Sequence, residues 1–157
     1  MQPENVNPND KRTERLTLGE KQRRLELCLT SAGLGIWTYN IATDEFWAND
    51  RAKHLHGHEP HEVHTFAEAG ANIHPEDRDR AQVAIAEAIQ TCSKLQLEYR
   101  VVWRDGSIRW LASQAEFVPL GEPGKGMFHG SVQDISDRLR LEGDRKRHEA
   151  ALGRVIN

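Results

Sequence analysis

Alternating apolar and polar positions are clearest in residues 95–118, LQLEYRVVWRDGSIRWLASQAEFV, where two strand-like runs flank Asp105 and Gly106. Such runs joined by Asp-Gly are typical of a β-hairpin with a two-residue type I′ turn, in which both central residues need positive φ. This turn predicts three facing pairs: Trp103 with Ile108, Val101 with Trp110, and Tyr99 with Ala112. One face of the hairpin is then apolar and needs further strands and a helical layer to cover it.

The N-terminal part of the chain predicts a leader, a helix and a second hairpin. Residues 1–16 hold two prolines and three asparagines and bury little apolar surface, which predicts a flexible leader. Thr17 and Glu20 form a capping box that predicts a helix over residues 17–32. Its apolar stripe consists of Leu25, Cys28, Leu29 and Ala32. Residues 34–41 and 45–48 predict two short paired strands.

The rest of the chain predicts short helices, a long helix, a last strand and a charged helix. Residues 50–70 are broken by Gly57 and Pro60, which favours short helical pieces. His74 precedes a longer helix that starts with proline and acidic residues. Its predicted apolar face consists of Ala81, Ile85, Ala88, Ile89 and Cys92. Residues 127–135 predict the last strand, and Asp134 or Ser136 caps the helix that follows.

Composition narrows the class of protein. The 157 residues, 38% hydrophobic and 29% charged, fit one domain with a core, and a net charge of −3 argues against nucleic acid as a partner. No apolar run approaches the roughly 18 residues of a membrane span, and no signal peptide is present, so we expect a cytoplasmic protein without membrane contact. Cys28 and Cys92 lie in helical patterns and predict reduced core thiols.

Histidine is concentrated in one segment, with five of the eight histidines within eleven residues: His54, His56, His58, His61 and His64. Neutral imidazole is a common ligand of metals and haem, and His61 and His64 have the i, i+3 spacing of one helix face. No cysteine and no established metal-ligand spacing accompanies them. We therefore favour a solvated loop without a metal, and keep as the alternative a haem or metal site that uses one of these residues or His74.

Four segments in order resemble the PAS domain family, in particular its bacterial signalling, PAS_3-like subtype: LCLTSAGLGIWTYNIATDEFWAND, NIHPEDRDR, LEYRVVWRDGSIRWL and GSVQDISDR. The resemblance implies an α+β fold with a five-stranded antiparallel sheet in the order 2-1-5-4-3, helices on one face and a small cavity. It also implies flanking N- and C-terminal helices that mediate dimerisation and carry signals. We expect a flanking helix over residues 17–32, a PAS core over residues 33–135 and a linker helix over residues 136–157.

Two sets of site residues follow from this arrangement. Large apolar residues on the elements that wall the interior are the candidates for a ligand pocket: Trp37, Phe46, Leu55, Phe66, Ile85, Ile89, Val101 and Trp110. Close packing is the ordinary fate of such residues, so a filled core is favoured over a vacant pocket. Val132, Asp134 and Ile135 are expected to relay a signal where the last strand becomes the terminal helix. There the Asp134 carboxylate would accept hydrogen bonds from the first turn.

Signatures of catalysis are absent, because the sequence has no Gly-rich phosphate loop, no Gly-x-Ser-x-Gly and no His-Glu-x-x-His. We therefore predict that this chain is not an enzyme. The light-sensing flavin branch of the family uses a cysteine in an Asn-Cys-Arg setting, which neither Cys28 nor Cys92 has. The sequence does not identify a cofactor. Its residues favour a protein without one, and haem and flavin are the alternatives.

The sequence thus predicts a non-catalytic sensory or regulatory module of a bacterial signal-transduction protein. It is expected to form a homodimer through its flanking helices, to sense a small ligand, and to act on a signalling kinase or another output domain. The two alternatives are a haem or metal sensor built on the histidines of residues 54–64 and a ligand-free protein-interaction adaptor.

Overall fold

The structure, a computed structural model, describes residues 17–155 and divides into two compact units at the boundary between Ala32 and Gly33. The first unit contains α1 (Leu18–Ala32), which begins with the predicted capping box. The Thr17 N–H donates to Glu20 Oε2 at 2.8 Å, and the Glu20 N–H donates to Thr17 Oγ1 at 3.2 Å. No residue of α1 is buried. The predicted flexible leader over residues 1–16 lies outside the described residues.

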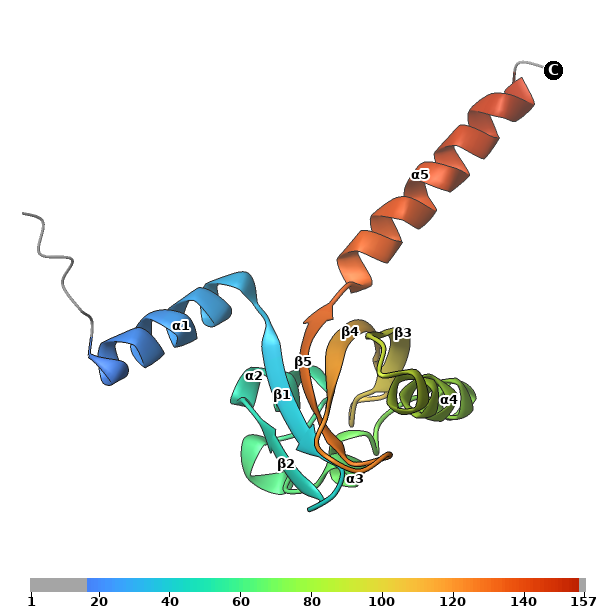
Figure 1. Ribbon diagram of the computed structural model, residues 1–157. Helices are drawn as coiled ribbons and strands as arrows, with labels where there is room; N and C mark the ends of the chain where they lie inside the picture. Colours follow the sequence, from blue (N-terminus) through green and yellow to red (C-terminus); the bar gives the residue numbers. More distant parts are fainter. Residues whose placement is uncertain (1–16, 156–157) are drawn as a thin grey trace, which may run out of the picture. The chain divides into compact units, whose positions relative to one another are not determined.

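The second unit is built on a five-stranded antiparallel sheet with helices on one face (Figure 1). The strands are β1 (Gly35–Asn40), β2 (Glu45–Ala48), β3 (Leu95–Val102), β4 (Ile108–Pro119) and β5 (Gly126–Asp134). Their order, β2-β1-β5-β4-β3, confirms the prediction. Between β2 and β3 the chain forms α2 (Asp50–Leu55), the 3₁₀ turn η1 (Pro60–Glu62), α3 (Phe66–Ala69) and α4 (Pro75–Thr91).

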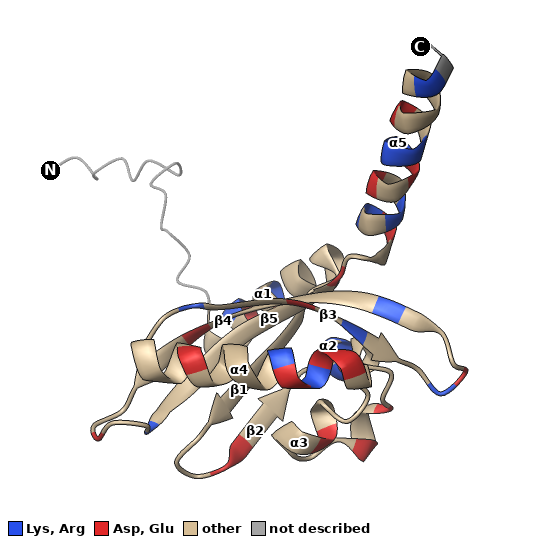
Figure 2. Cartoon of the chain, turned by 90° about the vertical axis from the view of Figure 1, so that its right-hand side faces the viewer, with Lys and Arg blue, Asp and Glu red and all other residues tan. Residues whose placement is uncertain are grey.

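The last element is α5 (Ser136–Val155), which follows β5 directly. Acidic and basic residues are interspersed along it (Figure 2). None of the helices within residues 17–155 is long and apolar enough to cross a membrane.

The core lies between the sheet and the helices that cover it. Successive side chains on a strand point to opposite faces, and the inward series on β5 includes Phe128 and Val132, both 0% exposed. Gly130 lies between them and faces Trp37 of β1. A Cβ on Gly130 would lie 2.5 Å from the indole ring, so glycine is what lets this tryptophan lie against the central strand.

The register of the central hairpin differs from the prediction by one residue. Tyr99 pairs with Leu111 and Val101 pairs with Arg109, each one position short of the predicted partner. A shift of one residue moves a whole strand face, because side chains alternate with a period of two. Leu111 is therefore buried, whereas Trp110 lies on the opposite face of the sheet, and the predicted apolar face is wrong on this strand.

The turn itself explains the shift. The Gly106 N–H donates to the Trp103 carbonyl at 2.9 Å, and the Trp103 N–H donates to the Ser107 carbonyl at 2.9 Å, which leaves a three-residue loop. Gly106 has φ +82, but Asp105 does not have positive φ, so the predicted type I′ turn is wrong. Instead the Asp105 carboxylate accepts from the Ser107 N–H at 2.9 Å, and the loop is a turn with a glycine bulge.

The two cysteines also depart from the prediction, and the stripe on α1 is largely exposed in the single chain. Cys28 and Cys92 are both free and exposed, so the expectation of core thiols is wrong. Cys92 ends α4 in the left-handed conformation, with φ 47, which takes it out of the apolar face of that helix. On α1, Leu25 is 58% exposed, and the predicted stripe is not buried within the described chain.

Candidate functional site

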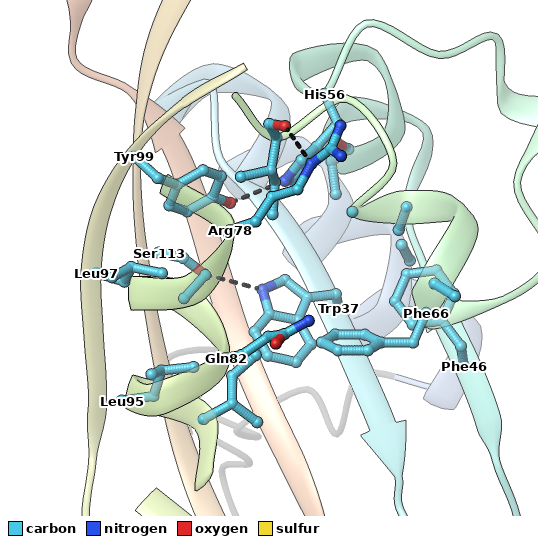
Figure 3. A pocket seen from close by; sticks show the side chains of 18 of the residues that line it. Trp37, Phe46, His56, Phe66, Arg78, Gln82, Leu95, Leu97, Tyr99 and Ser113 are labelled. Carbon is cyan, nitrogen blue, oxygen red and sulfur yellow. Dashed lines mark hydrogen bonds between the residues drawn. The ribbon is translucent and has the colours of Figure 1, made fainter. Parts of the chain in front are cut away.

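A pocket of about 380 Å³ lies between the inner face of the sheet and the helices α2, α3 and α4 (Figure 3). Four of the predicted candidates line it: Trp37, Phe46, Phe66 and Ile85. Whether the core beside this pocket is filled or vacant stays a prediction, and the space in the pocket comes from the other lining residues. Six of them are small, and they leave space that neighbouring side chains do not fill: Ala48, Ala52, Ala67, Ala69, Gly70 and Ala81.

The other four candidates do not line the pocket. Leu55 and Val101 are buried in the core, and Ile89 packs against it while partly exposed. Trp110 lies on the outer face of the sheet, where the guanidinium of Arg100 lies 5.5 Å from the centre of its ring. The one-residue shift of the hairpin is what removes Trp110 from the interior.

One end of the pocket is aromatic and centres on Phe66. A capping box starts α3, in which the Thr65 hydroxyl accepts from the Glu68 N–H at 3.1 Å, and this turn directs Phe66 toward the sheet. Its ring stacks on Tyr39, with centroids 4.3 Å apart, and lies 5.8 Å from Trp37 and 5.9 Å from Phe46. Contacts on three sides hold this ring as a fixed apolar wall.

The opposite end carries a hydrogen-bonded pair, His56 and Tyr99 (Figure 3). Nδ1 of His56 lies 2.8 Å from the carbonyl oxygen of Ala52, and Nε2 lies 2.8 Å from the Tyr99 hydroxyl. Because a carbonyl only accepts, Nδ1 carries the proton, and Nε2 of the neutral ring accepts from the Tyr99 hydroxyl. Burial lowers the pKa of His56 to about 4 and raises the pKa of Tyr99, so both groups are uncharged near neutral pH.

Hydrogen bonds also join the pocket wall to the central strand. The Trp37 Nε1–H donates to Ser113 Oγ at 3.3 Å, and the Ser113 hydroxyl donates to the Ser131 carbonyl of β5 at 3.2 Å. Ser113 is buried, and in the sheet it pairs with Val132. A movement of Trp37 can therefore reach β5 through Ser113, at a point two residues before that strand ends.

At the end of β5, the predicted cap of the terminal helix is present. Asp134 Oδ1 accepts from the Ser136 N–H at 2.8 Å. The Ser136 hydroxyl accepts from the Trp110 N–H at 2.9 Å, and the Ile135 N–H donates to the Trp110 carbonyl at 2.9 Å. Ile135 is buried. The three predicted relay residues, Val132, Asp134 and Ile135, thus lie at the point where α5 leaves the sheet.

At the start of α4, a charged cluster fixes this helix to the edge strand β3. Arg100 donates from Nε to Asp77 Oδ2 at 3.0 Å and from Nη2 to Asp77 Oδ1 at 2.8 Å, and its backbone N–H donates to Asp77 Oδ2 at 2.8 Å. The Asp77 side chain is 6% exposed. The Arg100 guanidinium holds the pKa of the Asp77 carboxyl well below its usual range. From the sequence, the position of Asp77 at the start of a helix is explained by the helix dipole alone. Nothing in the sequence indicates that Arg100 is its partner.

The remaining histidines of residues 54–64 point in different directions. The ring of His54 packs edge-on against Trp103, and Nε2 of His58 lies 3.3 Å from the Ala69 carbonyl oxygen. His61 and His64 do not share a helix face, because η1 ends at Glu62 and the next residue is extended. Within residues 17–155 no group of three or more His, Cys, Asp or Glu side chains is arranged to hold a metal ion.

Comparison with families and curated proteins gives consistent matches. The family model PAS_3, described as PAS fold, matches residues 45–130, more than half of the chain. The chain is 28% identical over 136 residues to a blue-light-activated histidine kinase of Brucella anthropi, covering 84% of this chain and 27% of that protein. It therefore spans about a quarter of the length of this relative.

Solved structures show the same fold. A sensory box histidine kinase/response regulator from Burkholderia thailandensis superposes with a TM-score of 0.67 at 28% identity, covering 83% of this chain and 98% of that one. An RNA-binding light-oxygen-voltage receptor superposes with a TM-score of 0.60 at 19% identity, covering 79% of this chain and 34% of that one. At this lower identity the second likeness concerns the fold alone.

Proposed function

The chain belongs to the PAS family, and on that premise we propose that it is a cytoplasmic sensory or regulatory module of a bacterial signal-transduction protein, without catalytic activity of its own. One observation carries the proposal: the pocket of about 380 Å³ in the core. The pocket is partly open to solvent, since Arg78 and Gln82 of its lining are exposed, so a small molecule could enter it, and an apolar pocket of this size suits a ligand. The similarity to sensor histidine kinases supports a kinase as the output, in the same protein or in a partner.

The proposed signal runs from the PAS core, residues 33–135, into the linker helix α5 (Ser136–Val155). A ligand that moves Trp37 acts on Ser113 through their hydrogen bond, and Ser113 is bonded to β5. Val132 and Ile135 are buried on either side of Asp134, whose carboxylate caps α5. A shift of β5 therefore changes the cap, and this biases the start of α5.

We also propose a homodimer formed through the flanking helices. Both helices carry exposed leucines: Leu18, Leu25 and Leu27 on α1 and Leu141 and Leu152 on α5. Burial of such side chains against a second copy would remove apolar surface from water. The double variant Leu25→Asp, Leu29→Asp should yield monomers by analytical ultracentrifugation, whereas the control Gln22→Asp should not. A monomeric wild type would overturn this part of the proposal.

Flavin photochemistry through a cysteine adduct does not fit this pocket. The relatives are named for activation by blue light, and a flavin adduct would need a thiol facing the ligand. No cysteine lines the pocket, and Cys28 and Cys92 are both exposed. We therefore propose a sensor of a small molecule rather than a light sensor that works through a cysteine adduct.

Native mass spectrometry tests the pocket, because it reports bound small molecules and oligomeric state together. The wild type should carry a small molecule or take one up from a metabolite extract. Ala81→Leu, which places a larger side chain in the pocket lining, should lose that mass. Ala150→Leu, an exposed position on α5, is the control and should keep it. If wild type and Ala81→Leu both stay free of ligand, the adaptor alternative replaces this proposal.

A further inference from the structure

The two ends of the pocket differ in chemistry (Figure 3). Phe46, Phe66 and Trp37 form the aromatic end. His56, Tyr99 and the guanidinium of Arg78 lie together at the other end. An apolar body with one polar group would find a matching surface at each end.

The charge of the lining has one sign. Its charged side chains are Lys53 and Arg78, and no aspartate or glutamate is among the lining residues. Lys53 Nζ donates to the Pro60 carbonyl at 3.1 Å, which holds the ammonium group in place. A cationic ligand would find no counter-charge among the lining residues, whereas the charged side chains that an anion would find are all cationic.

The guanidinium of Arg78 is held in position by the backbone. Its Nε donates to the Ile73 carbonyl at 3.1 Å and its Nη2 to the Ala71 carbonyl at 3.4 Å. Within residues 17–155 it has no carboxylate partner among the ion pairs, although several neighbouring arginines do. Arg78 is exposed at the open side of the pocket, so its remaining donors are accessible to a ligand there, and a planar guanidinium matches the geometry of a carboxylate.

His56 and Tyr99 complete this end of the pocket. In the neutral pair the Tyr99 hydroxyl donates to His56, and burial holds the pKa of His56 at about 4. When an anion binds and His56 takes up a proton on Nε2, the ring donates to the Tyr99 oxygen, and the hydroxyl proton of Tyr99 is free to bond to the anion. The pair therefore offers a hydrogen bond to an anion without adding a negative charge of its own.

We infer that the pocket binds a small carboxylic acid with an apolar body, whose carboxylate lies at the end formed by Arg78, His56 and Tyr99 and whose body lies against Phe66. This inference rests on the proposed function and adds the chemical class of the ligand. A single free guanidinium suits a monoanion, and the aromatic end suits an alkyl or aryl group.

The test uses two probes of equal chain length, octanoate and 1-octanol, titrated calorimetrically into the full chain. Wild type should bind octanoate, and Arg78→Gln should weaken octanoate about tenfold while leaving 1-octanol unchanged, a factor equal to about 1.4 kcal/mol. Arg78→Lys should recover part of the loss. Arg140→Gln, an exposed residue of α5 with the same change of charge, should bind like wild type. Thermal melting of each variant checks that it is folded.

The outcomes separate this inference from the proposed function. If wild type binds 1-octanol as tightly as octanoate, or if Arg78→Gln binds octanoate like wild type, the carboxylate inference is overturned while the pocket proposal stands. If neither probe binds at millimolar concentration, the inference is likewise overturned, and native mass spectrometry of wild type and Ala81→Leu then decides on the pocket.

Discussion

Two helices of the domain, α4 and α5, are attached to the sheet by the same kinds of group but in different surroundings. In each case an arginine and a carboxylate bridge the helix and the edge strand β3. The pair at α4 is Arg100 with Asp77, whose side chains are 24% and 6% exposed. The pair at α5 is Arg138 with Glu98, whose side chains are 50% and 51% exposed. Ion pairs that are shielded from water depend strongly on both partners, whereas exposed pairs contribute little.

The difference indicates that α4 is a rigid part of the pocket, whereas α5 is attached weakly enough to move. α4 lines the pocket and also packs Ala81 and Ala88 into the core. α5 is held at its first turn by the cap from Asp134 and by the bond between Ser136 and Trp110. A ligand whose binding energy is a few kcal/mol can shift the second attachment far more easily than the first.

Removing the buried charge at α4 should have the largest effect. Asp77→Asn keeps the shape but loses the negative charge that Arg100 faces, so the free energy of unfolding should fall by about 2 to 3 kcal/mol. Urea denaturation measures it. The control is Asp79→Asn, an exposed aspartate two residues further along the same helix, with an effect below about 0.5 kcal/mol. Equal effects of the two variants would show that α4 is not held by this cluster.

The second largest effect should come from lowering the pH, which should reduce the free energy of unfolding through His56. The pKa of His56 is about 4 in the folded protein and 6.5 as a free side chain, so between these values the unfolded chain binds a proton that the folded chain does not. The free energy of unfolding should therefore fall by about 2 kcal/mol as the pH drops from 6.5 to 4, allowing for partial exposure of the ring. His56→Gln should reduce this slope to the part that comes from carboxyl groups with lowered pKa, such as that of Asp77, and the exposed His61→Gln should keep the full slope. Denaturant titrations at several pH values would contradict the account if both variants kept the slope.

Loss of the cap at α5 should have a smaller and local effect. Asp134→Ala removes the acceptor of the Ser136 N–H, and loss of a cap typically costs about 1 kcal/mol. The core should stay folded while residues 136–150 exchange their amide hydrogens faster. Unchanged protection of these residues would mean that Asp134 does not hold the junction.

The exposed pair at α5 should contribute least. Glu98→Gln removes the partner of Arg138 on the surface, and such pairs are worth below about 0.5 kcal/mol in most cases. Thermal melting should show almost no change. A loss of more than about 1 kcal/mol would place this pair in the same class as Asp77 and Arg100 and remove the contrast between the helices.

The order of elements could be predicted from sequence, because capping residues and strand alternation are local signals. Thr17 with Glu20 and Asp134 with Ser136 act as the sequence indicates. The hairpin register could not, since Asp-Gly also fits a three-residue loop and the choice depends on how the strands pack. The one-residue shift in register is the reason that Leu111, and not Trp110, is buried.

The polar end of the pocket could not be predicted from the sequence either. His56 is one of five histidines within eleven residues, and nothing local shows that it faces Tyr99, forty-three residues away. Arg78 belongs to a run of charged residues at the start of α4, and only the fold shows that it lines the pocket while Arg80 pairs with Asp77. Contacts between distant elements set these roles, and a local pattern does not contain them.

Native-state hydrogen exchange on the wild-type chain, diluted until it is monomeric, tests the contrast between α4 and α5 most directly. Amides in the middle of α4 should exchange only through global unfolding, so their opening free energy should match that from urea denaturation. Amides of residues 136–150 should open locally, several kcal/mol below that value. Equal opening free energies for the two helices would contradict the account, because α5 would then be as fixed as the wall of the pocket.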